Sequence, residues 1–107
     1  MSAALDSLET QYLFLLQHLN DYEGACANDK QKASFGASFV TARQNYLDSL
    51  KKTFQDNDSK VADAVKDMKD AQDDLEDSLK HLNQIATVLN TISTAVKIGG
   101  KLAAMGA

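Results

Sequence analysis

The chain has 107 residues, with no proline, no tryptophan, a single cysteine and a formal net charge of −4. This length suits one small domain, and the lack of proline favours long uninterrupted helices over strands. The negative charge argues against a nucleic-acid-binding protein, which needs a basic surface to neutralise phosphates.

The first predicted helix spans residues 3–23. Its apolar residues are spaced three and four apart, which is a complete coiled-coil seam: Leu5, Leu8, Tyr12, Leu15, Leu19 and Tyr22. Three further apolar residues widen this seam, so the helix is expected to bury more than one face: Leu13, Phe14 and Leu16. Ser2 or Asp6 is expected to cap its start.

The second predicted helix spans residues 29–55 and follows a stretch without large apolar side chains. Residues 56–59 have short polar side chains, so they form a second expected break, and Asp58 or Ser59 is suited to cap the next helix. The third predicted helix spans residues 59–98. Gly99 and Gly100 are expected to end it, which leaves a C-terminal tail of residues 99–107.

An apolar residue recurs at every seventh position of the chain, and we call these residues the heptad series. A repeat of this period is typical of helices that pack side by side, so it predicts an all-α protein that associates through helices. The series consists of Leu5, Tyr12, Leu19, Cys26, Ala33, Val40, Leu47, Phe54, Val61, Met68, Leu75, Leu82, Leu89, Val96 and Ala103.

Two architectures fit this repeat. Between residues 36 and 58 the companion seam positions are mostly small or polar, so the middle of the chain is only half a seam. This favours an elongated bundle or hairpin of about three helices with coiled-coil-like packing in a single helical domain. The companion positions are Gly36/Ala37, Arg43/Gln44, Leu50/Lys51 and Asn57/Asp58. The alternative is one long helix through residues 37–98 in an oligomeric coiled coil, which would extend about 90 Å at 1.5 Å per residue.

The predicted function is that of a non-enzymatic interaction protein that self-associates or binds another helical protein, such as an adaptor, a chaperone or a secretion-system accessory. The third helix carries more apolar surface than the two shorter helices before it are expected to cover, so its apolar residues are the candidate partner-binding set. That set is Leu75, Leu79, Leu82, Ile85, Leu89, Ile92 and Val96.

Two other functions remain open. Residues 82–107 begin with an uncharged stretch and could lie on a membrane surface, although the stretch is short and polar for a membrane span. A stripe of carboxylates on the third helix is either a solvated face or an acidic ridge that inhibits a protein with a basic groove. The stripe consists of Asp63, Asp67, Asp70, Asp74 and Asp77.

Motifs for catalysis, cofactors or metals are not apparent. His18 and His81 are far apart and lack partners at ligand spacing, and Cys26 lacks an identifiable activating base. We therefore expect no enzymatic activity, no cofactor and no metal. The single cysteine and the lack of a charged, apolar leader indicate a cytoplasmic protein, or one exported without a cleavable signal peptide.

In length and helical format the chain resembles small helical proteins that are exported by specialised bacterial secretion machines. The WXG100 type of these proteins carries a Trp-x-Gly turn between two helices. Here the nearest string is Ser34-Phe35-Gly36, which lacks the tryptophan. The resemblance is therefore one of format, and it identifies no family.

Overall fold

In a computed structural model, which describes residues 2–107, the chain forms a packed bundle of helices. These are α1 (Ala3–Gln17), α2 (Leu19–Ala25), α3 (Asp29–Ser49), α4 (Ser59–Ser78) and α5 (Ile85–Ala103), with a short 3-10 helix, η1 (Leu79–Gln84), before α5. The described residues contain no strand. The predicted all-α bundle is therefore confirmed.

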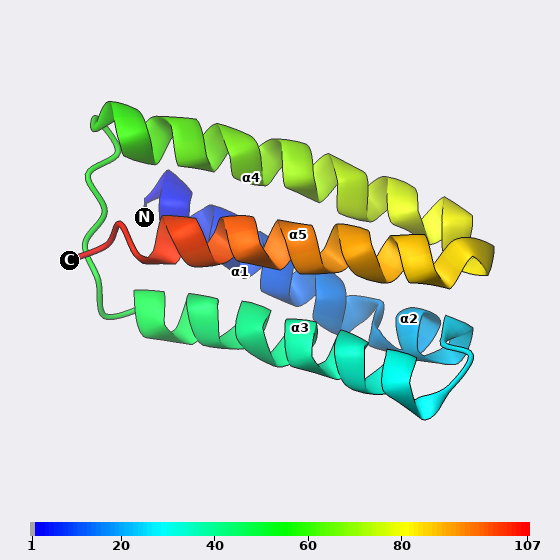
Figure 1. Ribbon diagram of the computed structural model, residues 1–107. Helices are drawn as coiled ribbons and strands as arrows, with labels where there is room; N and C mark the ends of the chain where they lie inside the picture. Colours follow the sequence, from blue (N-terminus) through cyan, green and yellow to red (C-terminus); the bar gives the residue numbers. More distant parts are fainter. Residues whose placement is uncertain (1) are drawn as a thin grey trace.

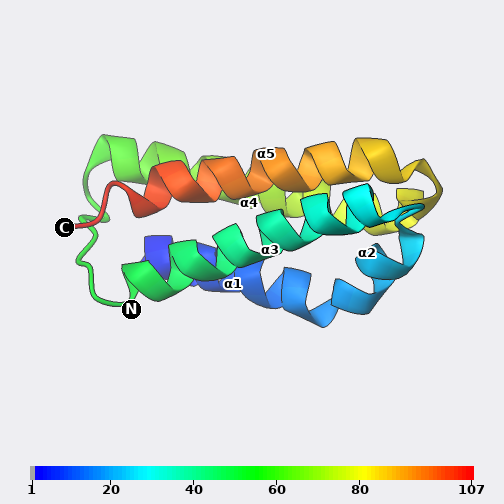
Figure 2. The same ribbon diagram turned by 60° about the horizontal axis from the view of Figure 1, so that its bottom comes forward.

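The helices pack as a four-cornered bundle in which α5 lies between α3 and α4, and α1 contacts the same two helices from the other side (Figures 1 and 2). α3 and α4 follow one another in sequence but occupy opposite corners, so residues 50–58 cross the end of the bundle. The molecule measures 43 × 22 × 18 Å. The alternative of one rod through residues 37–98 is therefore wrong.

The predicted third helix, residues 59–98, is also wrong, because the chain reverses within it. α4 ends at Ser78, η1 makes the turn with non-helical dihedrals at His81, and α5 returns antiparallel to α4 (Figure 1). No glycine or proline marks this turn. Its cause is tertiary, because folding back buries the apolar face of α5 against that of α4, and this packing outweighs local helix propensity.

The other predicted boundaries need smaller corrections. The predicted first helix is divided at His18 into α1 and α2, and the second ends at Ser49 instead of residue 55. At three helix starts the side-chain oxygens of Ser2, Asn28 and Asp58 accept hydrogen bonds from backbone N–H groups. The donors are Leu5, Gln31 and Lys60, respectively. Each such cap is worth about 1 kcal/mol.

The core consists of two apolar clusters separated by a polar layer. One cluster fills the half of the bundle nearest η1 and includes Leu75 and Ile92, while the other fills the opposite half and includes Leu8 and Leu102. Between them, the buried Gln11 donates from Nε2 to the backbone oxygen of Ala95 at 2.9 Å. The buried side-chain amide of Gln11 thus has a hydrogen-bond partner, as buried polar groups in folded proteins generally do.

Gly99 lies at the level of the polar layer, inside α5. The prediction that Gly99 and Gly100 end the helix at residue 98 is therefore wrong. Both glycines lie inside α5, which continues to Ala103, and neither has a positive φ. A Cβ built on Gly99 would lie 2.8 Å from Oε1 of Gln11. A glycine is therefore required at position 99 because α1 approaches α5 closely there, and not because the helix ends.

The C-terminal residues fasten the crossing loop. Thr53 and Ala107 exchange backbone hydrogen bonds of 2.8 and 3.1 Å, and Nζ of Lys52 donates to the backbone oxygen of Ala103 at 2.8 Å. A Cβ on Gly106 would lie 2.7 Å from Cζ of Phe54. The predicted tail, residues 99–107, is thus the last turn of α5 followed by a short segment that contacts residues 52–54.

Candidate interaction face

The predicted partner-binding residues fall into two groups. Four of them are at most 8% exposed and pack inside the bundle: Leu75, Leu89, Ile92 and Val96. The others are half-buried around η1 and pack against the same cluster: Leu79, Leu82 and Ile85. The segments predicted as the first two helices, which form α1, α2 and α3, do cover the apolar surface of α4 and α5. A partner therefore cannot reach the four buried residues while the bundle is closed.

The heptad series divides at the crossing loop. From Phe54 onward its members are buried, except for the half-buried Leu82. In α1 its members Leu5 and Tyr12 are only half-buried, and in α3 Val40 is 60% exposed. The repeat therefore describes the core in the second half of the chain, whereas in α3 it describes the outer surface.

The surface shared by α1 and α3 collects most of the exposed apolar side chains. Among the described residues, exposed fractions are 48% for Leu13, 45% for Leu16, 60% for Val40 and 50% for Leu50. Helical periodicity places them on the side away from the core, next to the half-buried Leu47. We call Leu13, Leu16, Val40, Leu47 and Leu50 the α1–α3 face; α1 and α3 lie side by side along it (Figure 2).

Aromatic packing beneath this face fixes α1 against α3. The ring of Tyr12 lies 5.8 Å from that of Phe39 and 5.9 Å from that of Tyr46, centroid to centroid. The hydroxyl of Tyr46 donates to Oε2 of Glu9 at 2.7 Å, and this bond to a carboxylate raises the pKa of Tyr46. The face therefore rests on a rigid contact between the two helices.

Sequence reasoning missed this face. Leu13 and Leu16 were expected to be buried because they widen the seam of the first helix, and Val40 belongs to a seam whose companions are polar. The sequence does carry a signal for this face, which is the mismatch between an apolar heptad residue and its polar companions. An apolar residue in the heptad series with polar companions at Arg43 and Gln44 indicates an apolar stripe without an intramolecular partner.

The acidic residues of the predicted stripe do lie on the surface of α4. Asp63, Asp67, Asp70, Asp74 and Asp77 are all exposed. α4 carries seven acidic residues and three lysines, so it accounts for the whole formal net charge of −4. The corner diagonal to α3 is thus strongly negative, while the remainder of the chain is neutral.

Two grooves flank α4. One of about 530 Å³ lies between α4 and α5 and is lined by polar residues, such as Asp74 and Thr91, together with apolar ones, such as Ile98; the other, of about 340 Å³, lies between α1 and α4. Every buried side-chain nitrogen and oxygen of the described residues has a hydrogen-bond partner. Neither groove therefore presents an unmet polar group that would select a ligand.

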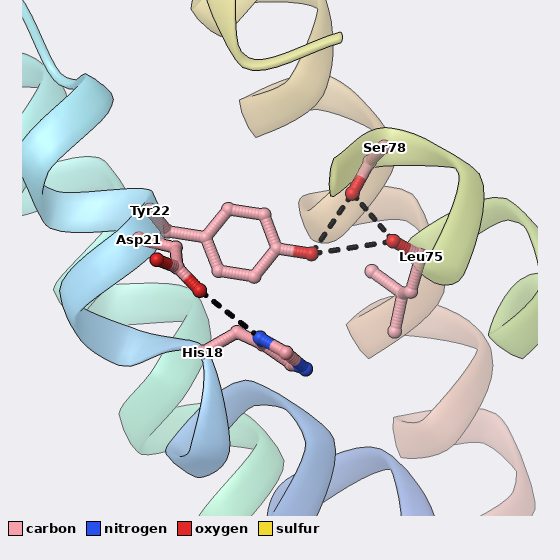
Figure 3. A network of polar contacts seen from close by, with 5 residues as sticks. All are labelled: His18, Asp21, Tyr22, Leu75 and Ser78. Atoms are coloured by element: carbon pink, nitrogen blue, oxygen red, sulfur yellow. Dashed lines mark hydrogen bonds and ion pairs between the residues drawn. The ribbon is translucent and has the colours of Figure 1, made fainter. Parts of the chain in front are cut away.

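A buried hydroxyl pair joins α2 to the end of α4 (Figure 3). The hydroxyl of Tyr22 lies 2.8 Å from Oγ of Ser78 and donates to the backbone oxygen of Leu75 at 3.3 Å. Nearby, Nδ1 of His18 is 3.1 Å from Oδ2 of Asp21, within the same turn. No nucleophile with an adjacent base results, and the pair acts as an interhelical contact.

We expect Tyr22→Phe to lower the free energy of unfolding by about 1 kcal/mol, because it removes a buried hydroxyl from its partners. Burial raises the pKa of Tyr22 above its ordinary value of 10.0. Its contribution is therefore complete below pH 10 and is lost as the pH rises through the folded-state pKa, because the unfolded phenol ionises first. Urea unfolding from pH 7 to pH 11 measures both effects.

The matched control is Tyr12→Phe, which changes a half-buried phenol in α1. At neutral pH it is expected to change the free energy of unfolding less than Tyr22→Phe does. Tyr22→Phe is also expected to lose less stability than the wild type as the pH is raised to 11. Equal alkaline losses in Tyr22→Phe and the wild type would contradict the role of this phenol.

The remaining candidates lie apart from one another. Burial raises the pKa of the Cys26 thiol, which disfavours the thiolate, and its Sγ donates to the backbone oxygen of Tyr22 at 3.4 Å. Nε2 of His81 is 3.6 Å from Oδ2 of Asp77 on the surface. The described residues contain no group of three or more His, Cys, Asp or Glu that could hold a metal ion.

Residues 82–107, predicted as a possible membrane surface, contribute Val88, Ile92 and Leu102 to the core. A lipid-binding role would therefore require α5 to leave the bundle. Within residues 2–107, no helix combines the length and the apolar character needed to cross a membrane.

Comparison with protein-family models, curated proteins and solved structures finds no match to this chain.

Proposed function

We propose that this protein is a non-enzymatic interaction module that docks a helical partner on its α1–α3 face, as an adaptor, a chaperone or a secretion-system accessory would. The observation that carries the proposal is the division of the heptad series. Its second half fills the core, while Val40 in α3 stays on the surface with 60% exposure. An apolar heptad pattern on an outer helix face supports a helix–helix contact with another molecule.

The rest of the surface supports the choice of this face. Exposed acidic residues cover α4, and two of them, Asp74 and Asp77, are among the residues that line the groove between α4 and α5. Charged residues are depleted at the centre of protein interfaces, whereas exposed apolar side chains gather there. The aromatic contacts of Tyr12 also hold α1 and α3 in fixed positions, so the face is preorganised for docking.

The test is the native size of the protein in an extract of its source cells. We expect it to sediment as a complex larger than a monomer, and Val40→Lys to shift it to the monomer because a charge is introduced at the centre of the apolar face. The control is Thr41→Lys, which changes an exposed residue one position further along α3. Thr41 lies about 200° around the helix from Phe39, which contacts α1, so it points away from the face.

A monomeric wild type in the extract would overturn the proposal. Equal disruption by Val40→Lys and Thr41→Lys would also overturn it, because the effect would then not depend on the face.

A further inference from the structure

We infer that the partner on the α1–α3 face is a second copy of this chain. The two copies pack α3 against α3 in antiparallel directions, with a twofold axis through Val40. This inference rests on the proposed docking function of the same face and adds the identity and orientation of the partner.

The charges at the two ends of α3 fit this arrangement. Asp29 precedes Val40 by eleven residues and Lys51 follows it by eleven. Eleven residues make about three helical turns, so Asp29 and Val40 lie along one line of the helix, and Lys51 follows in the turn at its end. An antiparallel twofold through Val40 sets Asp29 of each copy level with Lys51 of the other.

Both charged residues are free to make this contact. Asp29 and Lys51 are exposed, and neither takes part in the ion pairs found within residues 2–107, which are those of His18 with Asp21 and His81 with Asp77. The arrangement therefore gives two symmetric ion pairs, one at each end of the α3–α3 contact.

Side-chain size gives an independent reason for the same register. Between Asp29 and Val40 the outer line of α3 carries the small residues Ala33, Gly36 and Ala37, while beyond Val40 it carries the larger Arg43, Gln44 and Leu47. The antiparallel register sets Leu47 against Ala33, Gln44 against Gly36 and Arg43 against Ala37. A Cβ built on Gly36 meets no atom within 4 Å, so this position offers open space to a long side chain.

α1 joins the contact at the same height. The ring of Tyr12 packs at a tilt against that of Phe39, so the neighbouring Leu13 of α1 lies near the height of Val40 of α3. The twofold axis that brings Val40 to its symmetry mate also brings Leu13 to its own. Val40 and Leu13 thus lie at the centre of the interface with Arg43 beside them, and the pairs of Asp29 with Lys51 lie at its ends.

A parallel pairing of the two α3 helices lacks this complementarity. It sets Asp29 beside Asp29 and Lys51 beside Lys51, so like charges meet at both ends. It also sets Leu47 against Leu47 and leaves a gap between the small residues of the N-terminal halves. Charge and size therefore both select the antiparallel dimer.

Disulfide trapping in a Cys26→Ser background tests the register. We expect purified Val40→Cys to form a covalent dimer under mild oxidation, because the twofold axis brings this residue to itself. Thr41→Cys, the matched control, is expected to form no disulfide-linked dimer. Ala33→Cys alone is also expected to form none, because symmetry separates its two copies by about 21 Å along the helix. An equimolar mixture of Ala33→Cys and Leu47→Cys is expected to form the mixed dimer.

The outcomes separate the inference from the proposed function. Trapping of Ala33→Cys with itself would overturn the antiparallel register, and equal trapping of Thr41→Cys would show random collision and overturn the dimer. A purified wild-type chain that remains monomeric in sedimentation would also overturn the dimer. If the extract nevertheless contains a complex that Val40→Lys disrupts, the docking function survives with a different partner.

Charge exchange tests the ion pairs. We expect Asp29→Lys to weaken dimerisation about fivefold to tenfold, because two ion pairs become two repulsions. The double variant Asp29→Lys/Lys51→Asp restores opposite charges and is expected to return the dissociation constant to within about twofold of the wild type. Circular dichroism checks the fold, because Asp29 also lies in the first turn of α3. Failure of the double variant to recover, with the fold intact, would overturn the pairing.

Discussion

Replacing Gly99 with valine is expected to lower the free energy of unfolding by roughly 3 kcal/mol, because overpacking adds to the loss of a buried hydrogen bond. A Cβ at this position lies 2.8 Å from Oε1 of Gln11, 3.3 Å from Nδ2 of Asn45 and 3.5 Å from Cδ2 of Leu8. Gln11 cannot move away freely, because its Nε2 is bonded to the backbone oxygen of Ala95. Chemical denaturation measures the loss.

Gly100→Ala is the matched control, since it lies one residue further along the same helix. The nearest neighbours of a Cβ at Gly100 would be Nδ2 and Oδ1 of Asn45, each at 3.9 Å. Alanine is a better helix former than glycine, so we expect this variant to gain up to about 1 kcal/mol. Equal effects of Gly99→Val and Gly100→Ala would contradict the close approach of α1 to α5.

Ile92→Ala is expected to lower the free energy of unfolding by about 3–4 kcal/mol, because it leaves a cavity in a closely packed core. Ile92 is 0% exposed and belongs to the cluster that includes Leu75 and Val88. The loss is large beside the total stability of a small domain, about 5–15 kcal/mol. Thermal and urea unfolding give the value.

Leu13→Ala is the control for this substitution, because Leu13 is 48% exposed on the α1–α3 face. We expect it to cost the monomer less than about 1 kcal/mol while weakening association. If Ile92→Ala instead weakened association without affecting the unfolding of the monomer, the sequence-based set of partner-binding residues would be correct and the packing of α5 in the core would not.

The fold class followed from the sequence, but the path of the chain did not. The absence of proline and the presence of apolar periodicity predict helices, and Asp58 was among the expected caps of α4. The reversal at residues 79–84 has no glycine or proline, so only the packing of α5 against α4 determines it. Gly99 was misjudged for the same reason, because its role depends on Gln11, a residue 88 positions away in sequence.

The candidate face was predictable in part. The heptad series includes Val40 and Leu47, but the sequence does not reveal whether such a residue points inward or outward. That depends on Phe35 and Ala42, which are 1% exposed and occupy the inner side of α3. Two apolar stripes compete for the core along this helix, and only the three-dimensional arrangement shows which of them is buried.

The concentration of charge on α4 has a consequence for how molecules meet. All of the formal net charge of −4 lies on this helix, at the corner diagonal to α3, so each molecule has an electric dipole across its long axis. Two approaching copies repel most strongly where their α4 helices face one another, and this torque turns those sides apart. The diffusional encounter is thereby biased toward the α3 sides before any contact forms, and added salt removes the bias.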